Sequence, residues 1–171
     1  MHCLRRMSTL IYFAYGSNMS SRRLKARVPS ATVIGPGALD GHRRAFHKVS
    51  TKDGSAKCDI VESGPDHVLG VLFEIDAAEK STLDRLEGLG SGYEEKTVDI
   101  MLRSGACKRA FAYSATNIDD SLKPYSWYKR HVLEGAREAR LPSAYVELLE
   151  KVDAIEDPDE AREASELAIY G

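Results

Sequence analysis

Short apolar runs broken by glycine and proline occupy the first two thirds of the chain, and apolar residues at helical spacing occupy the last third. Runs rich in β-branched and aromatic residues are typical of strands, and glycine or proline at their ends marks turns. The pattern predicts strands over residues 9–15, 31–50, 58–62, 67–75, 97–102 and 109–116. A Ser-Gly-Pro-Asp sequence at residues 63–66 predicts a turn between the third strand and the fourth.

Helices are predicted where apolar residues recur every three to four positions and capping residues stand at the ends. One begins after Asp76, with Glu79 placed as in a capping box, and ends at Gly88. The others are predicted over residues 20–28, 126–139, 142–155 and 160–169. Strands followed by helices, without a repeat or a linker, indicate one α+β domain over residues 9–171. Residues 1–8 are interpreted as an N-terminal extension, either disordered or preceding an alternative start at Met7.

The composition argues against several classes of protein. The 171 residues suffice for one domain, and a hydrophobic content of 43% is enough to fill its core. The chain carries 24 Lys and Arg against 26 Asp and Glu, which argues against a nucleic-acid surface. No apolar run reaches the ~20 residues that cross a bilayer, and three separated cysteines suit a reducing compartment. We therefore expect a cytoplasmic protein without a nucleic-acid or membrane partner.

The sequence Tyr-Phe-Ala-Tyr-Gly-Ser-Asn-Met at residues 12–19 joins the first predicted strand to the first predicted helix. Gly16 allows a sharp turn, and the small residue Ser17 leaves the next backbone amides uncovered. Amides at such a turn, before a helix N-terminus, bind a carboxylate or an oxyanion. The alternative is an ordinary turn in which Ser17 or Asn18 caps the helix. Nucleotide binding is not expected, because the glycine motifs of nucleotide-binding loops are absent.

Glu87 is the last residue before the helix-ending Gly88. A carboxylate is disfavoured there, because the C-terminal end of a helix carries partial negative charge. Glu87 is therefore interpreted either as a solvated surface charge or as a general base. Tyr93, Tyr113 and Tyr128 also allow two interpretations, since their hydroxyls can position a polar substrate or their rings can simply fill the core.

Other chemistries lack the residues that they need. Ser17 has no histidine in a recognisable triad motif, and no histidines or cysteines stand at metal-ligand spacing. We therefore expect neither a metal nor another cofactor. Three charged segments are interpreted as solvated surface, namely the basic residues Arg22, Arg23, Lys25 and Arg27, the pair Glu94 and Glu95, and the acidic stretch 156–166.

Several motifs follow one another in a fixed order along the chain. They are YFAYGSNM at residues 12–19, HVLGVLF at 67–73, LDRLEG at 83–88, SGY at 91–93, and GARE, LP and Tyr145 from residue 135 onward. Residues 109–113 and 125–129 add two segments that carry tyrosines. Together these motifs extend from about residue 11 to residue 155 and resemble the γ-glutamylcyclotransferase family. An ordered set of motifs is far more specific than any one of them.

The resemblance implies an α+β fold built round a small mixed β-barrel, with helices packed outside and a cleft at one end of the barrel. It also implies that Glu87 is the catalytic acid/base. The substrate-binding residues that it implies are Tyr12, Phe13, Ala14, Tyr15, Gly16, Ser17, Asn18, Tyr93, Tyr113 and Tyr128. The loop between Gly88 and Tyr93 is a residue shorter than in the vertebrate enzymes, and Glu94 and Glu95 replace apolar residues there.

The reaction that the resemblance implies closes a γ-glutamyl group to 5-oxoproline by attack of the substrate's own α-amino group. Glu87 moves the proton, and the free amine leaves. We expect a small-molecule γ-glutamyl substrate, such as γ-glutamyl-lysine, glutathione or an acylated antibiotic, and a monomer or a homodimer. A catalytically silent binding protein on the same fold is the alternative, because fold does not fix function.

Overall fold

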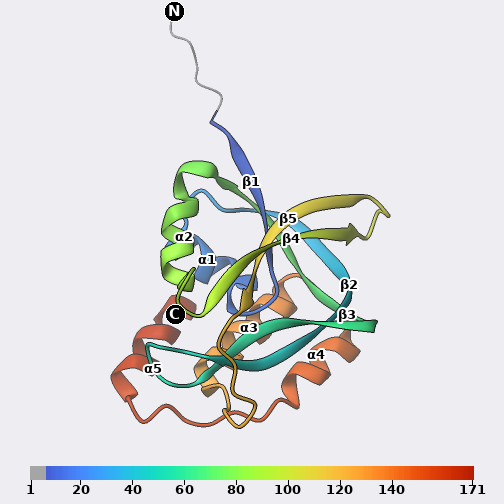
Figure 1. Ribbon diagram of the computed structural model, residues 1–171. Helices are drawn as coiled ribbons and strands as arrows, with labels where there is room; N and C mark the ends of the chain where they lie inside the picture. The colour runs from blue at the N-terminus through green and yellow to red at the C-terminus, as the bar shows by residue number, and fades with distance from the viewer. Residues whose placement is uncertain (1–6) are drawn as a thin grey trace, which may run out of the picture.

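A computed structural model describes residues 7–171, and its strands close into a barrel (Figure 1). The strands are β1 (Thr9–Ala14), β2 (Thr32–Val49), β3 (Ala56–Asp76), β4 (Tyr93–Leu102) and β5 (Cys107–Ala115). Their order is β1-β3-β2-β4-β5, and a parallel pairing of Tyr12 with Phe111 closes the barrel, whereas the other neighbours are antiparallel. The predicted mixed barrel in a single α+β domain is confirmed. The prediction of an N-terminal extension falls largely on residues 1–6, which lie outside the described residues.

Strand β3 runs without interruption through the segment where a turn was predicted. His42 pairs with Glu62 and Asp40 pairs with His67, so that residues 63–66 bulge out without partners on β2. These residues are largely exposed, and Ser63 donates a hydrogen bond to Asp66 across the bulge. The prediction of two separate strands is therefore wrong, because the β2–β3 ladder resumes beyond the unpaired residues.

The helices cover the barrel in two groups (Figure 1). Helices α1 (Ser21–Arg27) and α2 (Lys80–Glu87) contact each other, and α3 (Ser126–Glu138) contacts both α4 (Ser143–Glu150) and α5 (Glu160–Leu167). Short 3₁₀ turns are formed by Ser17–Met19, Ala77–Glu79 and Ala168–Tyr170. Within residues 7–171, no helix is long and apolar enough to span a membrane.

Helix α4 ends at Glu150, earlier than the predicted residue 155. Ile155 is instead held in an extended conformation by backbone pairing. Its N–H donates to the carbonyl of Pro124 at 3.0 Å, and its carbonyl accepts from the N–H of Ser126 at 2.9 Å. This pairing fixes the start of α3 and explains why the helical pattern is cut short.

The entry to α2 differs in one detail from the prediction. Asp76 caps the first turn, since its carboxylate accepts from the N–H of Ala78 at 2.9 Å. Glu79 does not complete a capping box. Its carboxylate accepts from the N–H of Ser30 at 3.0 Å instead, which ties the start of α2 to the segment after α1.

Close packing against α3 fixes the loop that follows β1. A Cβ at Gly135 would lie 2.4 Å from atoms of Met19 and Ser20, so only glycine lets the helix approach this closely. Met19 and Leu24 are buried beneath the loop and α1. The loop is therefore anchored on both sides by the core, as a binding site on a rigid scaffold requires.

Candidate active site

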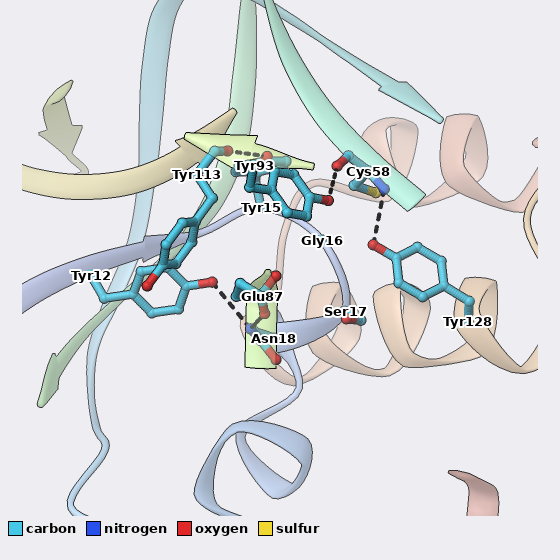
Figure 2. Close-up of a pocket in the computed structure, with 10 residues that line it drawn as sticks. All are labelled: Tyr12, Tyr15, Gly16, Ser17, Asn18, Cys58, Glu87, Tyr93, Tyr113 and Tyr128. Atoms are coloured by element: carbon cyan, nitrogen blue, oxygen red, sulfur yellow. Dashed lines mark hydrogen bonds between the residues drawn. The ribbon is translucent and has the colours of Figure 1, made fainter. Parts of the chain in front are cut away.

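An inner cavity lies between the loop after β1 and the C-terminal end of α2 (Figure 2). Most of the predicted site residues line it, namely Tyr12, Tyr15, Gly16, Ser17, Asn18, Glu87, Tyr93, Tyr113 and Tyr128. The structure does not place Phe13 and Ala14 there. Both are fully buried in the core, where the Phe13 ring packs against Gly70. Cys58 also lines the inner cavity and was not predicted.

Gly16 is required by the space around it. A Cβ at this position would lie 2.9 Å from the Cβ of Cys58 and 3.1 Å from the hydroxyl oxygen of Tyr128. Its φ of −116° is not in the left-handed region. Gly16 is therefore needed because the loop passes close to β3 and α3, rather than for a left-handed turn.

The backbone amides of the loop are free to bind an anion. Within residues 7–171, the N–H groups of Gly16, Ser17 and Asn18 donate to no carbonyl and no side chain. The residue that caps α1 is Ser20, whose Oγ accepts from the N–H of Arg23 at 3.4 Å. The alternative prediction, in which Ser17 or Asn18 caps the helix, is wrong. Successive free amides of this kind form an anion-binding concavity.

Glu87 lies against this loop, at the end of α2. Gly88 ends the helix in the left-handed conformation with φ of 77°, as predicted. The Glu87 side chain is 16% exposed, and its Oε1 accepts from Asn18 Nδ2 at 2.5 Å and from an Arg27 guanidinium nitrogen at 3.4 Å. Among the described residues, Oε2 has no hydrogen-bond partner. One oxygen thus holds the carboxylate in place, and the other is available to a ligand.

Asn18 connects the loop, the barrel and the carboxylate (Figure 2). Its Nδ2 donates to the hydroxyl of Tyr12 at 3.2 Å as well as to Glu87. Its Oδ1 is buried and has no partner within residues 7–171. A buried amide oxygen without a donor is uncommon and costs free energy. Asn18 can therefore accept a hydrogen bond from a cationic or N–H group bound beside Glu87.

The tyrosines form a frame in which most hydroxyls are already held by the protein. Tyr93 donates to the carbonyl of Cys58 at 2.5 Å, and Tyr128 accepts from the N–H of Cys58 at 3.0 Å. Tyr113 donates to Asp84 at 2.6 Å, and Tyr15 donates to the carbonyl of Tyr113. Burial raises the pKa of all four hydroxyls well above the usual range. These side chains thus present neutral walls of fixed shape.

Cys58 is not a nucleophile at neutral pH. Burial raises the pKa of its thiol to about 11, so that almost none of the reactive thiolate is present. Within residues 7–171, no group of three or more His, Cys, Asp and Glu side chains is arranged to hold a metal ion. Glu87 is the carboxylate that lines the inner cavity.

A larger outer cavity adjoins the inner one, and both are lined by Ser17, Glu87, Tyr93 and Tyr128. Cationic side chains predominate in its walls. They are Arg23, Arg27, Lys48, Lys52, Lys57 and Arg162, against the carboxylates of Asp53, Glu87 and Glu166. The outer cavity is thus suited to an anionic group.

Two of the segments interpreted as solvated surface contribute to these walls. Arg23 is 8% exposed and donates to Ser17 Oγ at 3.2 Å and to Glu166 at 2.5 Å. Burial alone would raise the pKa of Glu166, but hydrogen bonds from His131 and Arg23 outweigh it and lower the pKa to about 2. The surface interpretation is wrong for Arg23, Arg27 and Glu166, because α5 packs against α3 and the 3₁₀ turn Ala168–Tyr170 after it contacts α1. The spacing of four between Arg23 and Arg27 was a signal that both point to one side of α1.

Comparison with known proteins gives consistent results. The profile of the AIG2-like family matches residues 67–149. A γ-glutamylcyclotransferase from Mus musculus is 32% identical over 150 residues, which cover 85% of this chain and 79% of the relative. The Bos taurus γ-glutamylcyclotransferase is 32% identical over 163 residues, covering 92% of this chain and 85% of the relative. A solved structure of a γ-glutamyl cyclotransferase superimposes with a TM-score of 0.83 at 27% identity, covering 91% of this chain and 96% of that one.

Proposed function

This chain belongs to the γ-glutamylcyclotransferase family of enzymes, and we propose that it converts the γ-glutamyl group of a γ-glutamyl amine, amino acid or peptide into 5-oxoproline. The observation that carries the proposal is the inner cavity itself. It joins the free amides of Gly16, Ser17 and Asn18 to a carboxylate, Glu87, that has one oxygen without a partner among the described residues. A γ-glutamyl group carries the complementary charges, an α-carboxylate and an α-ammonium.

In the proposed reaction the α-nitrogen of the substrate attacks its own γ-carbonyl carbon. The new C–N bond closes a five-membered lactam, and the bond between the γ-carbonyl and the leaving nitrogen breaks. The α-ammonium loses two protons in all, and the leaving nitrogen gains two, so that neither water nor an oxidant is consumed. Holding both reacting groups in one folded conformation can lower the barrier by roughly 7–11 kcal/mol. We infer that no metal or other cofactor is needed.

Glu87 is proposed as the acid/base. Its free Oε2 takes a proton from the α-ammonium, which makes that nitrogen nucleophilic, and later delivers a proton to the leaving nitrogen. Asn18 supports both steps, since its Nδ2 holds Oε1 and its unpartnered Oδ1 can accept from the α-ammonium. The loop amides bind either the α-carboxylate or the developing oxyanion, and one oxyanion donor is typically worth about 3–4 kcal/mol.

The test is a screen of γ-glutamyl amines, amino acids and peptides with the full-length protein, in which 5-oxoproline and the free amine are measured together. The proposal predicts that at least one compound yields both products in equal amounts. If no compound is turned over while one or more bind, the protein is a γ-glutamyl-binding protein on the same fold, and the enzymatic proposal fails.

A further inference from the structure

The outer cavity contains a lysine that forms no ion pair with the residues that the structure describes. Lys48 is 6% exposed, and within residues 7–171 its Nζ makes no hydrogen bond and no ion pair. It lies over the Tyr93 ring, 4.5 Å from the centroid. The side chain is largely enclosed, but Nζ itself keeps contact with the solvent of the outer cavity. The face of an aromatic ring replaces an anionic partner only in part, so an anion that enters this cavity can pair with the ammonium group.

The register of the sheet makes this position more unusual. Lys48 on β2 pairs directly with Lys57 on β3, and both side chains line the outer cavity. Like charges directly opposite each other destabilise a strand pair. Lys57 is compensated, since its Nζ donates to Asp53 at 3.0 Å and to Ser55 at 3.1 Å. Lys48 has no such hydrogen bond among the described residues, and the carboxylates of Glu87 and Asp53 act on it only from a distance.

The other cations of the outer cavity are paired or solvated. Arg23 contacts Glu166, Arg27 contacts Glu87, and Arg162 forms two hydrogen bonds of 2.6 Å with Asp157. Lys52 is exposed to solvent. Lys48 is thus the cation of this cavity that is both buried and without an acceptor among the described residues.

A β-bulge at His47 sets this arrangement. Phe46 pairs with Cys58 and Lys48 pairs with Lys57, so that His47 is the additional residue on β2. The two ring nitrogens of His47 hydrogen bond to Asp59 at 2.7 Å and to Asp120 at 2.8 Å. β-Bulges beside active sites commonly change the direction in which a side chain points. Here the bulge places Lys48, rather than His47, opposite Lys57.

We propose that Lys48 is a specificity-determining residue that binds a carboxylate on the leaving amine of the substrate. The proposal rests on the proposed function above. A γ-glutamyl group in the inner cavity has its γ-carbonyl near Glu87, and Glu87 and Tyr93 also line the outer cavity. The leaving amine therefore extends past Tyr93 into the outer cavity, where Lys48 lies over that ring. Lys48 selects substrates whose leaving group is acidic over those whose leaving group is neutral or cationic.

The test compares γ-glutamyl-alanine with γ-glutamyl-alaninamide, which differ only in the charge at the leaving-group carboxyl. In the parent protein, kcat/KM for the acid should exceed that for the amide by about tenfold to a hundredfold, the range of a hydrogen bond to a charged group. In Lys48→Met this ratio should fall close to one, and in Lys48→Arg it should remain well above one. Lys151→Met is the control, because it removes an exposed lysine that lines neither cavity, and it should keep the parent ratio.

The outcomes separate this proposal from the proposed function. The proposal is overturned if the parent protein turns over both substrates equally, or if Lys48→Met lowers kcat/KM for both by the same factor. Either result would mean that Lys48 does not recognise the leaving-group carboxylate. The cyclisation itself would stand in that case. If the parent protein forms no 5-oxoproline from either compound or from any other γ-glutamyl compound, the proposed function fails instead. Because the ratio is measured within one variant, partial loss of folded protein does not change it.

Discussion

The inner and outer cavities share a boundary at Glu87 and Tyr93 but are built in opposite ways. The inner cavity is walled by tyrosines that the protein holds by hydrogen bonds, and Glu87 is the carboxylate that lines it. The outer cavity is walled by charged side chains, most of them in ion pairs. A neutral frame of fixed shape is suited to chemistry on the γ-glutamyl group, which is the same in every substrate. A charged wall is suited to recognising the leaving group, which varies between substrates.

The difference also shows in how each cavity is supported. The inner one depends on close backbone approaches, at Gly16 against Cys58 and at Gly135 against Met19. The outer one depends on long-range charge pairs, such as Arg23 with Glu166 and Arg162 with Asp157. We therefore expect substitutions in the inner cavity to affect turnover most, and substitutions in the outer cavity to affect substrate choice and stability.

The largest effect is expected for Glu87→Gln. Glutamine keeps the size of the side chain but cannot accept a proton at neutral pH, so 5-oxoproline formation should fall by about 10²–10⁴-fold, the usual contribution of general acid–base catalysis. Glu94→Gln and Glu95→Gln, both exposed on β4, are the controls and should retain turnover. Near-normal turnover in Glu87→Gln, or loss in a control alone, would show that another group moves the proton.

Asn18→Ala should have a smaller effect on the same step. It removes the hydrogen bond that holds Oε1 of Glu87 and the acceptor Oδ1 beside it. We expect kcat to fall by about tenfold to a hundredfold, the range of one hydrogen bond to a charged group, with a shifted pH profile of kcat. Asn117→Ala, at an exposed position, is the control. An unchanged pH profile would indicate that Asn18 only shapes the loop.

In the outer cavity, Glu166→Gln should change stability with pH. The pKa of Glu166 in the folded protein, about 2, lies below the ordinary value of 4.5, so its stabilisation is complete above pH 4.5 and is lost as pH falls toward 2. The variant should therefore lose stability at pH 7 and show a shallower decline in the free energy of unfolding below pH 4.5. Denaturant unfolding at several pH values measures this, with Glu156→Gln, exposed and distant from Arg23, as the control. If the free energy of unfolding falls equally steeply below pH 4.5 in the parent and in Glu166→Gln, Glu166 is not the carboxylate responsible for this pH dependence.

No effect is expected from chelation. The proposed ring closure involves no redox change, and the substrate supplies its own nucleophile. Turnover of a γ-glutamyl substrate should therefore be the same before and after exhaustive treatment with EDTA. Loss of turnover that is restored by a divalent metal would contradict the proposed mechanism.

Much of the inner cavity could be predicted from the sequence, because its parts are local. A strand ending at Gly16 and a helix ending at Gly88 are each visible as short patterns, and the ordered motifs indicate that Glu87 belongs with the loop. The sequence could not show that Gly16 is required for space, since the atoms it approaches belong to Cys58 and Tyr128. Phe13 and Ala14 were included with their neighbours although their side chains lie in the core.

The outer cavity was largely missed, because its residues come together through long-range pairing. The position of Lys48 opposite Lys57 depends on one extra residue in β2, and nothing in the alternation of polar and apolar residues marks that bulge. The local sequence around Arg23 and around Glu166 indicates solvated charges. The two side chains form an ion pair only because α5 lies beside α3. Charge pairs between segments far apart in the chain are not visible in a local pattern.

The claim that the substrate's own α-amino group is the nucleophile can be tested by product analysis. The full-length protein is incubated with a γ-glutamyl compound that it turns over and with the N-acetyl form of that compound, and the products are identified by mass spectrometry. The account predicts equal amounts of 5-oxoproline and free amine from the first compound and no cleavage of the second. Release of glutamate, or cleavage of the N-acetyl compound, would contradict it, because either result requires water or a protein side chain as the nucleophile.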